Sequence, residues 1–129
     1  MAEDTGSTSS ILIVEDEILV RMFAVDVLEE AGFRVEQAAT GAEAFACLES
    51  TPTLAAAIVD LGLPDRPGDE VAAEIREKRA ALPILIASGR SERELKERFA
   101  NDARVAILAK PYTEPMLLEA LRQLGIGAA

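Results

Sequence analysis

Histidine and tryptophan are absent from this 129-residue sequence, and cysteine occurs once. Without histidine the chain cannot form a Ser-His-Asp triad, a zinc site with imidazole ligands or a phosphohistidine of its own. The single cysteine, Cys47, permits no disulfide within the chain. Its place in an apolar helical pattern predicts a small core side chain.

Long apolar runs and an excess of basic residues are also missing. The longest runs, such as Leu54 to Val59, are far shorter than the roughly 20 residues that a membrane span needs. The polar start MAEDTGSTSS has no signal-peptide pattern. Thirteen Lys and Arg against 23 Asp and Glu give a net charge of −10, which disfavours binding to nucleic acid or to anionic membranes. We therefore expect a cytoplasmic protein. We also expect it to bind neither nucleic acid nor membranes.

The length and composition predict one domain. Hydrophobic residues make up 50% of the chain and charged residues 28%, which is typical of a globular protein. A chain of this length rarely divides into two domains. The polar start predicts a disordered tail over residues 1–9, followed by a domain over 10–125 and a short tail over 126–129.

Five short apolar runs predict strands. Runs without alternation are typical of strands buried on both faces of a parallel sheet, and the second run, which is half polar, matches this pattern less closely. The runs are Ile11–Val14, Phe33–Gln37, Leu54–Val59, Ile84–Ala87 and Val105–Ala109.

Segments with helical periodicity separate these runs. The first carries its apolar residues at positions 18, 19, 22, 23 and 28. Thr40 with Glu43 predicts a capping box, Thr113 predicts the start of the last helix, and Gly32 and Gly125 lie where helix ends favour positive φ. The basic positions 76, 78 and 79 are expected to form a solvated helix end. The (βα)5 order predicts an α/β fold, a doubly wound five-stranded parallel sheet with helices on both faces.

Acidic, hydroxyl and basic side chains come at the ends of four of the predicted strands. Glu15, Asp16 and Glu17 follow the first strand and Asp60 follows the third, while Ser88 and Lys110 follow the fourth and fifth. The carboxyl ends of parallel strands meet at one edge of a sheet, where ligands bind in open α/β folds. We therefore expect these side chains to form one site.

The chemistry of these groups indicates phosphoryl transfer. Three clustered carboxylates (Glu15, Asp16 and Asp60) repel one another unless a cation compensates, and oxygen ligands on an open site favour Mg²⁺. Asp60 is then the expected nucleophile, forming an aspartyl phosphate. Lys110 is expected to neutralise phosphoryl charge and Ser88 to donate a hydrogen bond to a phosphoryl oxygen.

Each of these residues also has an ordinary structural explanation. Glu15 and Asp16 can simply begin a helix, where carboxylates favour the dipole. Asp60 can be a turn residue before Gly62, and Ser88 and Lys110 can be loop residues. Their arrival from four separate strands at one edge favours a common site over four independent accidents.

With these motifs the sequence resembles the receiver domains of bacterial two-component response regulators, of the stand-alone type. The matching pieces are ILIVEDE at 11–17, DLGLP at 60–64 with Gly68 beyond it, ILIASG at 84–89 and AKPY at 109–112. The likeness spans about residues 10–125. It implies a flavodoxin-like receiver fold with the strand order 2-1-3-4-5.

The resemblance also implies residue roles. Asp60 resembles the phosphoacceptor, and Glu15 and Asp16 resemble the acidic pair that holds Mg²⁺, one directly and one through water. The backbone carbonyl of Gly62 is expected to be a further metal ligand. Ser88 matches the switch hydroxyl and Lys110 the phosphate-contacting lysine, whose bond to the following proline is expected to be cis.

One position departs from the pattern of many receivers. Ile107 stands where they carry an aromatic switch residue, three positions before Lys110. We hypothesise that Gly89 instead lets the loop to the fourth helix re-form around the phosphoryl group. A response of residues 88–100 to a phosphoryl mimic would support this idea.

The resemblance predicts a phosphorylation-controlled signalling receiver of a two-component system or phosphorelay. A histidine kinase or histidine phosphotransfer protein is expected to supply the phosphoryl group, because this chain has no histidine. Its docking surface is expected to include Ile18, Leu19 and Val20 with Pro111 and Tyr112. The signal is expected to leave through contact with an unknown downstream protein, by change in the fourth helix, fifth strand and fifth helix.

Two alternatives stay open. The first is a receiver excised from a hybrid histidine kinase or a longer regulator, although the Met1 start and the short tail after the last helix favour a stand-alone chain. The second is an Mg²⁺-dependent phosphohydrolase with an aspartyl nucleophile. Such enzymes commonly need a second Asp two residues after the first, where this chain has Gly62. We expect no enzyme activity beyond self-phosphorylation and autodephosphorylation at Asp60.

Overall fold

In the computed structural model, which describes residues 9–89 and 92–127, five strands and five helices alternate along the chain. Of the predicted tails, residues 1–8 and 128–129 lie outside the described ranges. The strands are β1 (Ser10–Val14), β2 (Arg34–Ala38), β3 (Leu54–Asp60), β4 (Ile84–Ser88) and β5 (Val105–Ala109), and the helices are α2 (Ile18–Glu30), α3 (Gly41–Ser50), α4 (Gly68–Lys78), α5 (Glu92–Arg98) and α6 (Glu114–Gln123).

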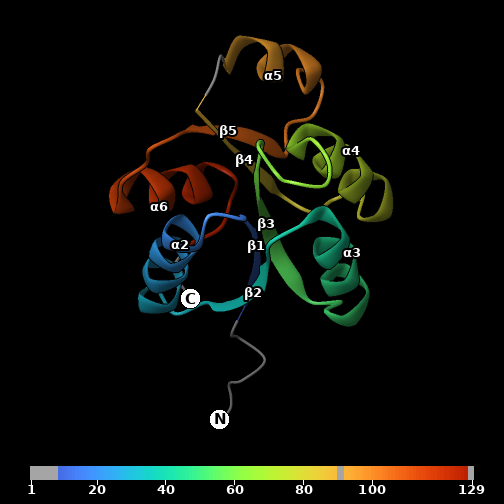
Figure 1. Ribbon diagram of the computed structural model, residues 1–129. Coiled ribbons are helices and arrows are strands. Elements are labelled where there is room, and N and C mark those ends of the chain that lie inside the picture. Colours follow the sequence, from blue (N-terminus) through green and yellow to red (C-terminus); the bar gives the residue numbers. More distant parts are fainter. Residues whose placement is uncertain (1–8, 90–91, 128–129) are drawn as a thin grey trace.

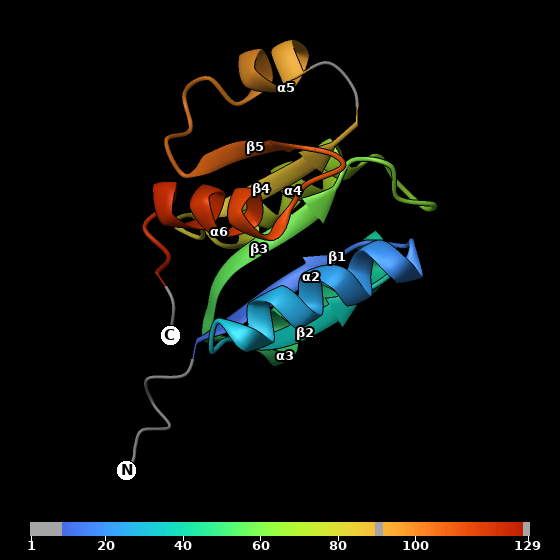
Figure 2. The ribbon, with the colours of Figure 1, turned by 90° about the vertical axis from the view of Figure 1, so that its left-hand side faces the viewer.

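The strands form one sheet in the order β2-β1-β3-β4-β5. Each neighbouring pair is parallel, and Val14 at the end of β1 pairs with Ala38 of β2 and Val59 of β3. The arrowheads therefore point to the same side of the molecule (Figure 2). The predicted fold class and strand order are both confirmed.

Burial explains why the three middle strands are the most apolar. All five residues of β1 and of β4 are buried, and six of the seven in β3 are buried as well. The edge strands β2 and β5 keep part of their surface exposed, which accounts for the half-polar sequence of β2.

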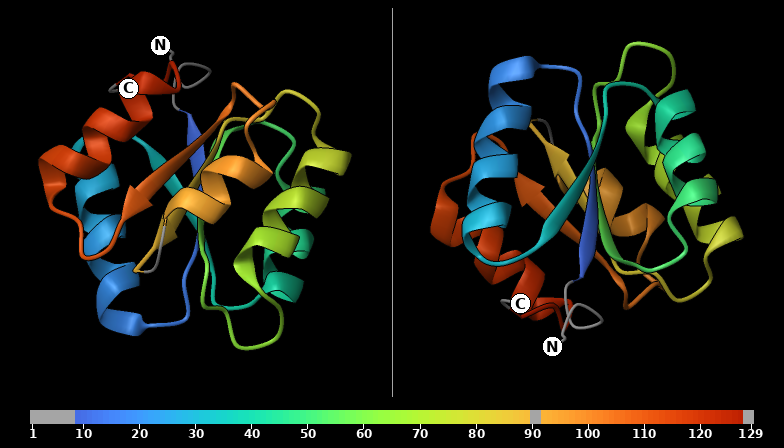
Figure 3. Two further views of the ribbon diagram at one scale, coloured as in Figure 1. Left: turned by 90° about the horizontal axis from the view of Figure 1, so that it is seen from above. Right: turned by 90° about the horizontal axis from the view of Figure 1, so that it is seen from below.

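The helices divide the core into two layers, one on each face of the sheet. Ala24, Val27 and Leu28 of α2 pack with Leu117 and Leu121 of α6 on one face. Apolar side chains of α3, α4 and α5 pack on the other face. Figure 1 and both views of Figure 3 show α2 and α6 on the side of the sheet opposite α3 and α4. None of the described helices combines the length and apolarity that a membrane crossing requires.

The predicted helix caps form, with one change. The Glu43 amide donates to Thr40 Oγ1 at 3.1 Å and the Met116 amide to Thr113 Oγ1 at 3.4 Å. The Glu43 carboxylate accepts from the amide of Ala39 at 2.8 Å, one residue before the cap residue of an ordinary capping box. Gly32 and Gly125 have φ of 99° and 89°, so both predicted helix ends are confirmed.

The expectation of a solvated basic end on α4 is wrong for two of its three residues. Arg76 donates to Asp102 Oδ2 at 2.7 Å and to the carbonyl of Leu82 at 2.6 Å. Arg79 donates to the carbonyls of Leu48 and Thr51 near the end of α3. Of the three, only Lys78 is exposed. The two arginines are drawn away from solvent because carbonyl and carboxylate acceptors lie on neighbouring elements, which the sequence does not reveal.

Candidate functional site

The three predicted metal-binding carboxylates lie together at the carboxyl edge of the sheet. Glu15 directly follows β1 and Asp60 is the last residue of β3, the strand that pairs with β1. One carboxylate oxygen each of Glu15, Asp16 and Asp60 lies within 4.8 Å of the others. Glu15 and Asp60 are 2% and 5% exposed, while Asp16 faces solvent and gives the cluster an open side.

Lys110, which follows β5, brings a cation to this cluster. Its Nζ lies 2.7 Å from Asp60 Oδ1 and 3.1 Å from Glu15 Oε1, with Glu17 Oε1 at 3.5 Å. Burial alone would lower the pKa of Lys110, but the hydrogen bonds and charges of Asp60 and Glu15 outweigh it and raise the pKa. The lysine is therefore held as an ammonium ion against the Asp60 carboxylate.

Glu15 is fixed by its backbone as well as by Lys110. The Glu17 amide donates to Glu15 Oε2 at 3.0 Å, and Arg21 Nη1 donates to the Glu15 carbonyl at 2.9 Å. Burial, and then the charge of Asp60, raise the pKa of the Glu15 carboxyl, although the Glu17 amide and Lys110 act in the opposite direction. A buried carboxylate in this position gains from a nearby cation.

Ser88 and Gly62 lie beside Asp60 on the neighbouring strand and the following loop. Ser88 is 1% exposed at the end of β4, and the residue before it pairs with Asp60 across the sheet. Its carbonyl accepts from the Lys110 amide at 2.9 Å, which joins the ends of β4 and β5. The Gly62 amide donates to Asp60 Oδ2 at 3.0 Å, so Asp60 has a donor on each oxygen.

A cleft of about 1250 Å³ opens over this edge of the sheet. Asp60, Gly62 and Lys110 line it together with residues of α4 and α5, including Asp69 and Arg98. The Asp60 carboxylate therefore borders an open cleft and not a closed interior.

The donor set fits a hard divalent cation. Its three carboxylates supply only oxygen, and among the described residues Lys110 is the cation bonded to two of them. One ammonium leaves the cluster with excess negative charge, and oxygen ligands select Mg²⁺ over softer metals.

A second hollow of about 460 Å³ adjoins the site and is mostly apolar. Leu19, Val20, Pro111 and Tyr112 line it, as the predicted docking surface requires, and so does Phe23. Ile18 does not line it but is 59% exposed on the same helix. Burial, and then the charge of Glu15, raise the pKa of Tyr112 to about 12, so its hydroxyl stays protonated.

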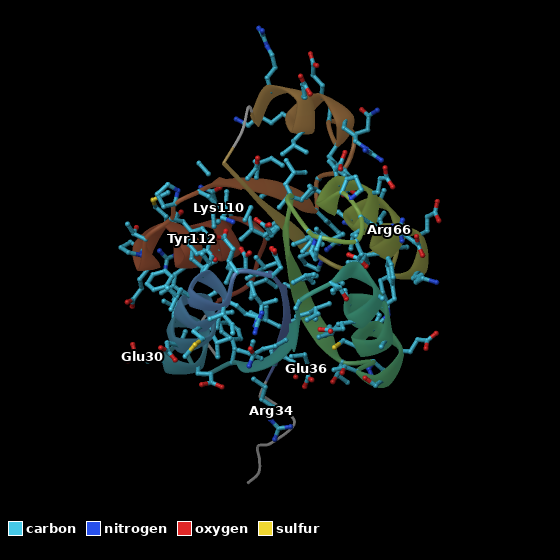
Figure 4. All side chains as sticks on the ribbon, in the orientation of Figure 1. Glu30, Arg34, Glu36, Arg66, Lys110 and Tyr112 are labelled. Carbon is cyan, nitrogen blue, oxygen red and sulfur yellow. The ribbon has the colours of Figure 1, made fainter. Side chains whose placement is uncertain are left out.

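Phe23 was not predicted for this surface, because its helical spacing made it part of the apolar pattern of α2. In the structure the apolar residues of α2 divide into a buried set and an exposed set. Ala24, Val27 and Leu28 are buried, while Leu19 and Phe23 are 79% and 40% exposed. The Phe23 ring lies 6.1 Å from the ring of Tyr112. Figure 4 shows Lys110 and Tyr112 on the α2 and α6 side of the sheet, with Arg66 on the opposite side.

The resemblance to receiver domains implies a cis peptide bond after Lys110 and draws attention to Ile107 on β5. The bond between Lys110 and Pro111 is cis, as expected. Ile107 is partly buried on β5 and packs against the core on the α3 and α4 face of the sheet.

Comparisons with known proteins agree on one family. The family model described as response regulator receiver domain matches residues 11–122. The chain is 37% identical over 120 residues to the transcriptional regulatory protein PdtaR of Mycobacterium tuberculosis, covering 92% of this chain and 57% of that protein. It is 28% identical over 124 residues to the sensor kinase CckA of Brucella abortus, covering 95% of this chain and 13% of that protein. The chain thus spans little more than half of the first relative and a small part of the second.

Solved structures give the same result. The chemotaxis protein CheY4 of Vibrio cholerae is 28% identical with a TM-score of 0.84, covering 92% of this chain and 99% of that one. A response regulator receiver protein of Sinorhizobium medicae is 31% identical with a TM-score of 0.80, covering 93% and 96%.

Proposed function

Because this chain belongs to the response regulator receiver domain family, we propose that Asp60 is the residue through which it works as a phosphorylation-controlled signalling receiver. The observation that carries this proposal is the contact of Lys110 Nζ with Asp60 Oδ1 and Glu15 Oε1, at 2.7 and 3.1 Å, inside a cluster of three carboxylates. A carboxylate nucleophile, a fixed ammonium ion and room for a divalent cation are the parts that phosphoryl transfer needs.

The proposed step transfers a phosphoryl group from a histidine of another protein. A carboxylate oxygen of Asp60 attacks phosphorus, the P–N bond breaks as the new P–O bond forms, and the leaving imidazole nitrogen keeps the electron pair. Lys110 is within reach of the phosphoryl oxygens because it already contacts Asp60, and its ammonium offsets their charge. Ser88 at the end of β4 supplies the hydroxyl that binds a phosphoryl oxygen.

Glu15, Asp16, Asp60 and the backbone carbonyl of Gly62 would hold Mg²⁺. When bound, Mg²⁺ offsets the charge of the carboxylates and of the transferring phosphoryl group. The oxygen-only donor set and the excess negative charge support this assignment. Hydrolysis of the aspartyl phosphate, with self-phosphorylation, is the only catalysis that we propose for the chain.

Receivers of this family take phosphoryl groups from histidine kinases. We propose that a helix of the histidine kinase or phosphotransfer protein docks in the apolar hollow beside Lys110. Lys110 and Glu17 line both this hollow and the large cleft, so a partner seated there would place its histidine close to Asp60. The exposed Leu19 and Phe23 supply the apolar contacts.

The proposed output is a change in α5, β5 and α6 that a downstream protein reads. Ile107 is not aromatic, and a Cβ built on Gly89 meets no described atom within 4 Å, so the described side chains do not confine the backbone at Gly89 itself. Backbone amide shifts with and without a phosphoryl mimic test this coupling, which is wrong if residues 88–100 do not respond.

The acceptor is tested by intact mass after incubation with Mg²⁺ and acetyl phosphate. Wild-type protein and the control Asp26→Ala, an exposed change on α2, should gain one phosphoryl group, and the gain should require Mg²⁺. Asp60→Ala should gain none. Labelling of Asp60→Ala would place the acceptor elsewhere. No labelling of wild type, with acetyl phosphate or a panel of histidine kinases, would indicate a scaffold that signals without phosphate.

The docking hollow is tested by comparing two phosphodonors. Phe23→Glu should slow transfer from a phosphorylated histidine kinase or phosphotransfer protein by about tenfold or more, because an interface anchor is lost. It should leave labelling by acetyl phosphate unchanged. Met116→Glu is the matched control, because Met116 is 38% exposed on α6 and does not line the hollow. Equal effects of both variants would argue against this surface.

A further inference from the structure

The loop that joins β3 to α4 is hydrogen-bonded to α3, a helix that it does not directly connect. The carboxylate of Asp65, in the middle of this loop, accepts from the amide of Gly41 at 2.9 Å and from that of Ala42 at 3.1 Å. Both amides belong to the first turn of α3, where backbone donors have no partner within the helix. These bonds hold the pKa of Asp65 below its usual range, so the anchor is charged at neutral pH.

Packing around Asp65 shows how closely the loop and α3 approach each other. A Cβ on Gly41 would lie 3.0 Å from Val71 Cγ2 and 3.4 Å from the Asp65 carboxylate. Arg66, the next residue of the loop, lies over the ring of Phe45 in α3 at 5.4 Å and forms an ion pair with Glu74 at 2.8 Å. The middle of the loop therefore has two neighbouring attachments to α3.

The base of the same loop is fixed against the acceptor residue. The Gly68 amide donates to the Leu61 carbonyl at 2.8 Å, and a Cβ on Gly68 would lie only 2.0 Å from the Asp60 carbonyl oxygen. Gly62 lies between this base and Asp65, and its amide donates to Asp60 Oδ2 at 3.0 Å. Only Leu63 and Pro64 separate Gly62 from Asp65, so the anchored carboxylate and the donor to Asp60 lie on one short stretch of backbone.

We propose that Asp65 is a positioning residue for Asp60. By tying the β3–α4 loop to the start of α3, it holds the Gly62 amide against Asp60 Oδ2 and keeps the Gly62 backbone beside the carboxylate cluster. Part of this inference rests on the proposed function, because a fixed Asp60 serves phosphoryl transfer and metal binding only if Asp60 is the acceptor. The effect on the Gly62 amide does not depend on that function.

The test compares Asp65→Ala with Thr40→Ala. Thr40 Oγ1 also accepts a backbone amide at the start of α3, that of Glu43, but Thr40 is not part of the loop. Both variants should lose some helix-cap stability. In metal-free protein Asp65→Ala should speed solvent exchange of the Gly62 amide by about tenfold, as expected when its hydrogen bond is largely lost, while Thr40→Ala should stay within about twofold of wild type.

Mg²⁺ affinity and phosphorylation by acetyl phosphate provide the second readout. Asp65→Ala should weaken Mg²⁺ binding and slow phosphorylation by about tenfold, the lower end of the range seen when residues supporting a metal site are lost. Thr40→Ala should change neither. Asp65→Asn, which keeps one carbonyl acceptor, should be intermediate in both readouts and replaces Asp65→Ala if that variant does not fold.

The outcomes separate this inference from the proposed function. If wild type gains no phosphoryl group and binds no Mg²⁺, the proposed function fails, and the Gly62 exchange rate still decides whether Asp65 positions the loop. If wild type is active but Asp65→Ala behaves like Thr40→Ala, or leaves the Gly62 amide unchanged, Asp65 is only a helix cap and the inference is overturned.

Discussion

Lys110 has two opposing effects on the oxygens that surround it. Its ammonium group contacts Asp60 and Glu15, so it stabilises the carboxylate cluster when no metal is bound. The same contacts make it a competitor of a divalent cation for these oxygens. In the proposed phosphoryl transfer, in contrast, its charge and that of a bound cation would both offset the charge of the incoming group.

Lys110→Met should therefore separate metal binding from phosphoryl transfer. Without the ammonium, Mg²⁺ should bind at least as tightly as in wild type, because the cluster becomes more negative. Phosphorylation by acetyl phosphate should slow by about 10- to 100-fold, the loss of one charge-assisted hydrogen bond in the transition state. Mg²⁺ titration and the labelling rate measure the two effects, with Lys78→Met as an exposed control. A parallel fall of both quantities would contradict this assignment.

Asp102 is a residue whose charge stabilises the fold away from the site. Its carboxylate accepts from Arg76 Nε at 2.7 Å and from the Arg104 amide at 3.0 Å. Burial alone would raise the pKa of Asp102, but these bonds and the charge of Arg76 outweigh it and lower the pKa. Because the folded-state pKa is below the unfolded one, the charged carboxylate stabilises the fold above the unfolded value and loses this effect as the pH falls through the folded value.

Asp102→Asn should lower the free energy of unfolding by about 1–2 kcal/mol at pH 7, a value reduced for partial exposure of the pair. The difference from wild type should shrink as the pH falls below about 4, the ordinary range of an aspartate. Urea unfolding of both proteins at a series of pH values measures this difference in unfolding free energy. A difference that stays constant down to the acid limit would mean that packing, and not charge, is what the substitution removes.

At the scale of elements, the sequence predicts what depends on local pattern and family motif. The apolar runs locate all five strands to within one residue at each end, because buried strands leave a continuous apolar signature. The strand-end rule brings Glu15, Asp60 and Lys110 together because the carboxyl ends of parallel strands share an edge.

The contacts that hold neighbouring elements together could not be predicted in this way. Asp65 accepts from amides 24 and 23 positions away, and Arg79 reaches carbonyls 31 and 28 positions away. Such bonds depend on how helices pack side by side, which neither periodicity nor capping motifs encode. A charged residue near a helix end has the same local pattern whether it stays exposed, as Lys78 does, or is hydrogen-bonded to another element, as Arg79 is.

Arg79→Met tests how much one such contact stabilises the packing of α4 against α3. Arg79 donates to the carbonyls of Leu48, Thr51 and Pro52, and that of Leu48 is one of the last four of α3, which have no donor within the helix. The variant should lose about 1.5–3 kcal/mol of unfolding free energy, as for hydrogen bonds from a charged donor. Lys78→Met, one position earlier and exposed, should change it by no more than about 0.5 kcal/mol. Chemical denaturation of both variants measures the contrast, and equal losses would argue against a bonded role for Arg79.

At the scale of the whole molecule, the site exists only when the complete sheet has formed. Glu15 and Lys110 contact each other across 95 positions of the chain, and Asp60 comes from a third strand between them in the sheet. An unfolded chain cannot keep these oxygens together, so a cation that binds the cluster must favour the folded state. Metal binding and global stability are therefore linked.

This linkage predicts that Mg²⁺ raises the melting temperature through the carboxylate cluster. At a Mg²⁺ concentration tenfold above its dissociation constant the folded state gains about 1.4 kcal/mol, which corresponds to a rise of about 4–6 °C for a domain of this size. Asp16→Asn removes one of the three carboxylates and should abolish most of the rise. Asp26→Asn, an exposed acid on α2, should retain it.

A net charge of −10 makes the choice of reference salt decisive, because any cation screens the repulsion among so many acidic residues. The rise must therefore be measured against NaCl at the same ionic strength, where screening is matched and only specific binding remains. Without Mg²⁺, Asp16→Asn should melt no lower than wild type, since removing one of the clustered charges relieves repulsion. If Mg²⁺ stabilises Asp16→Asn as much as wild type, the cation acts on the overall charge of the molecule and not at the carboxyl edge of the sheet.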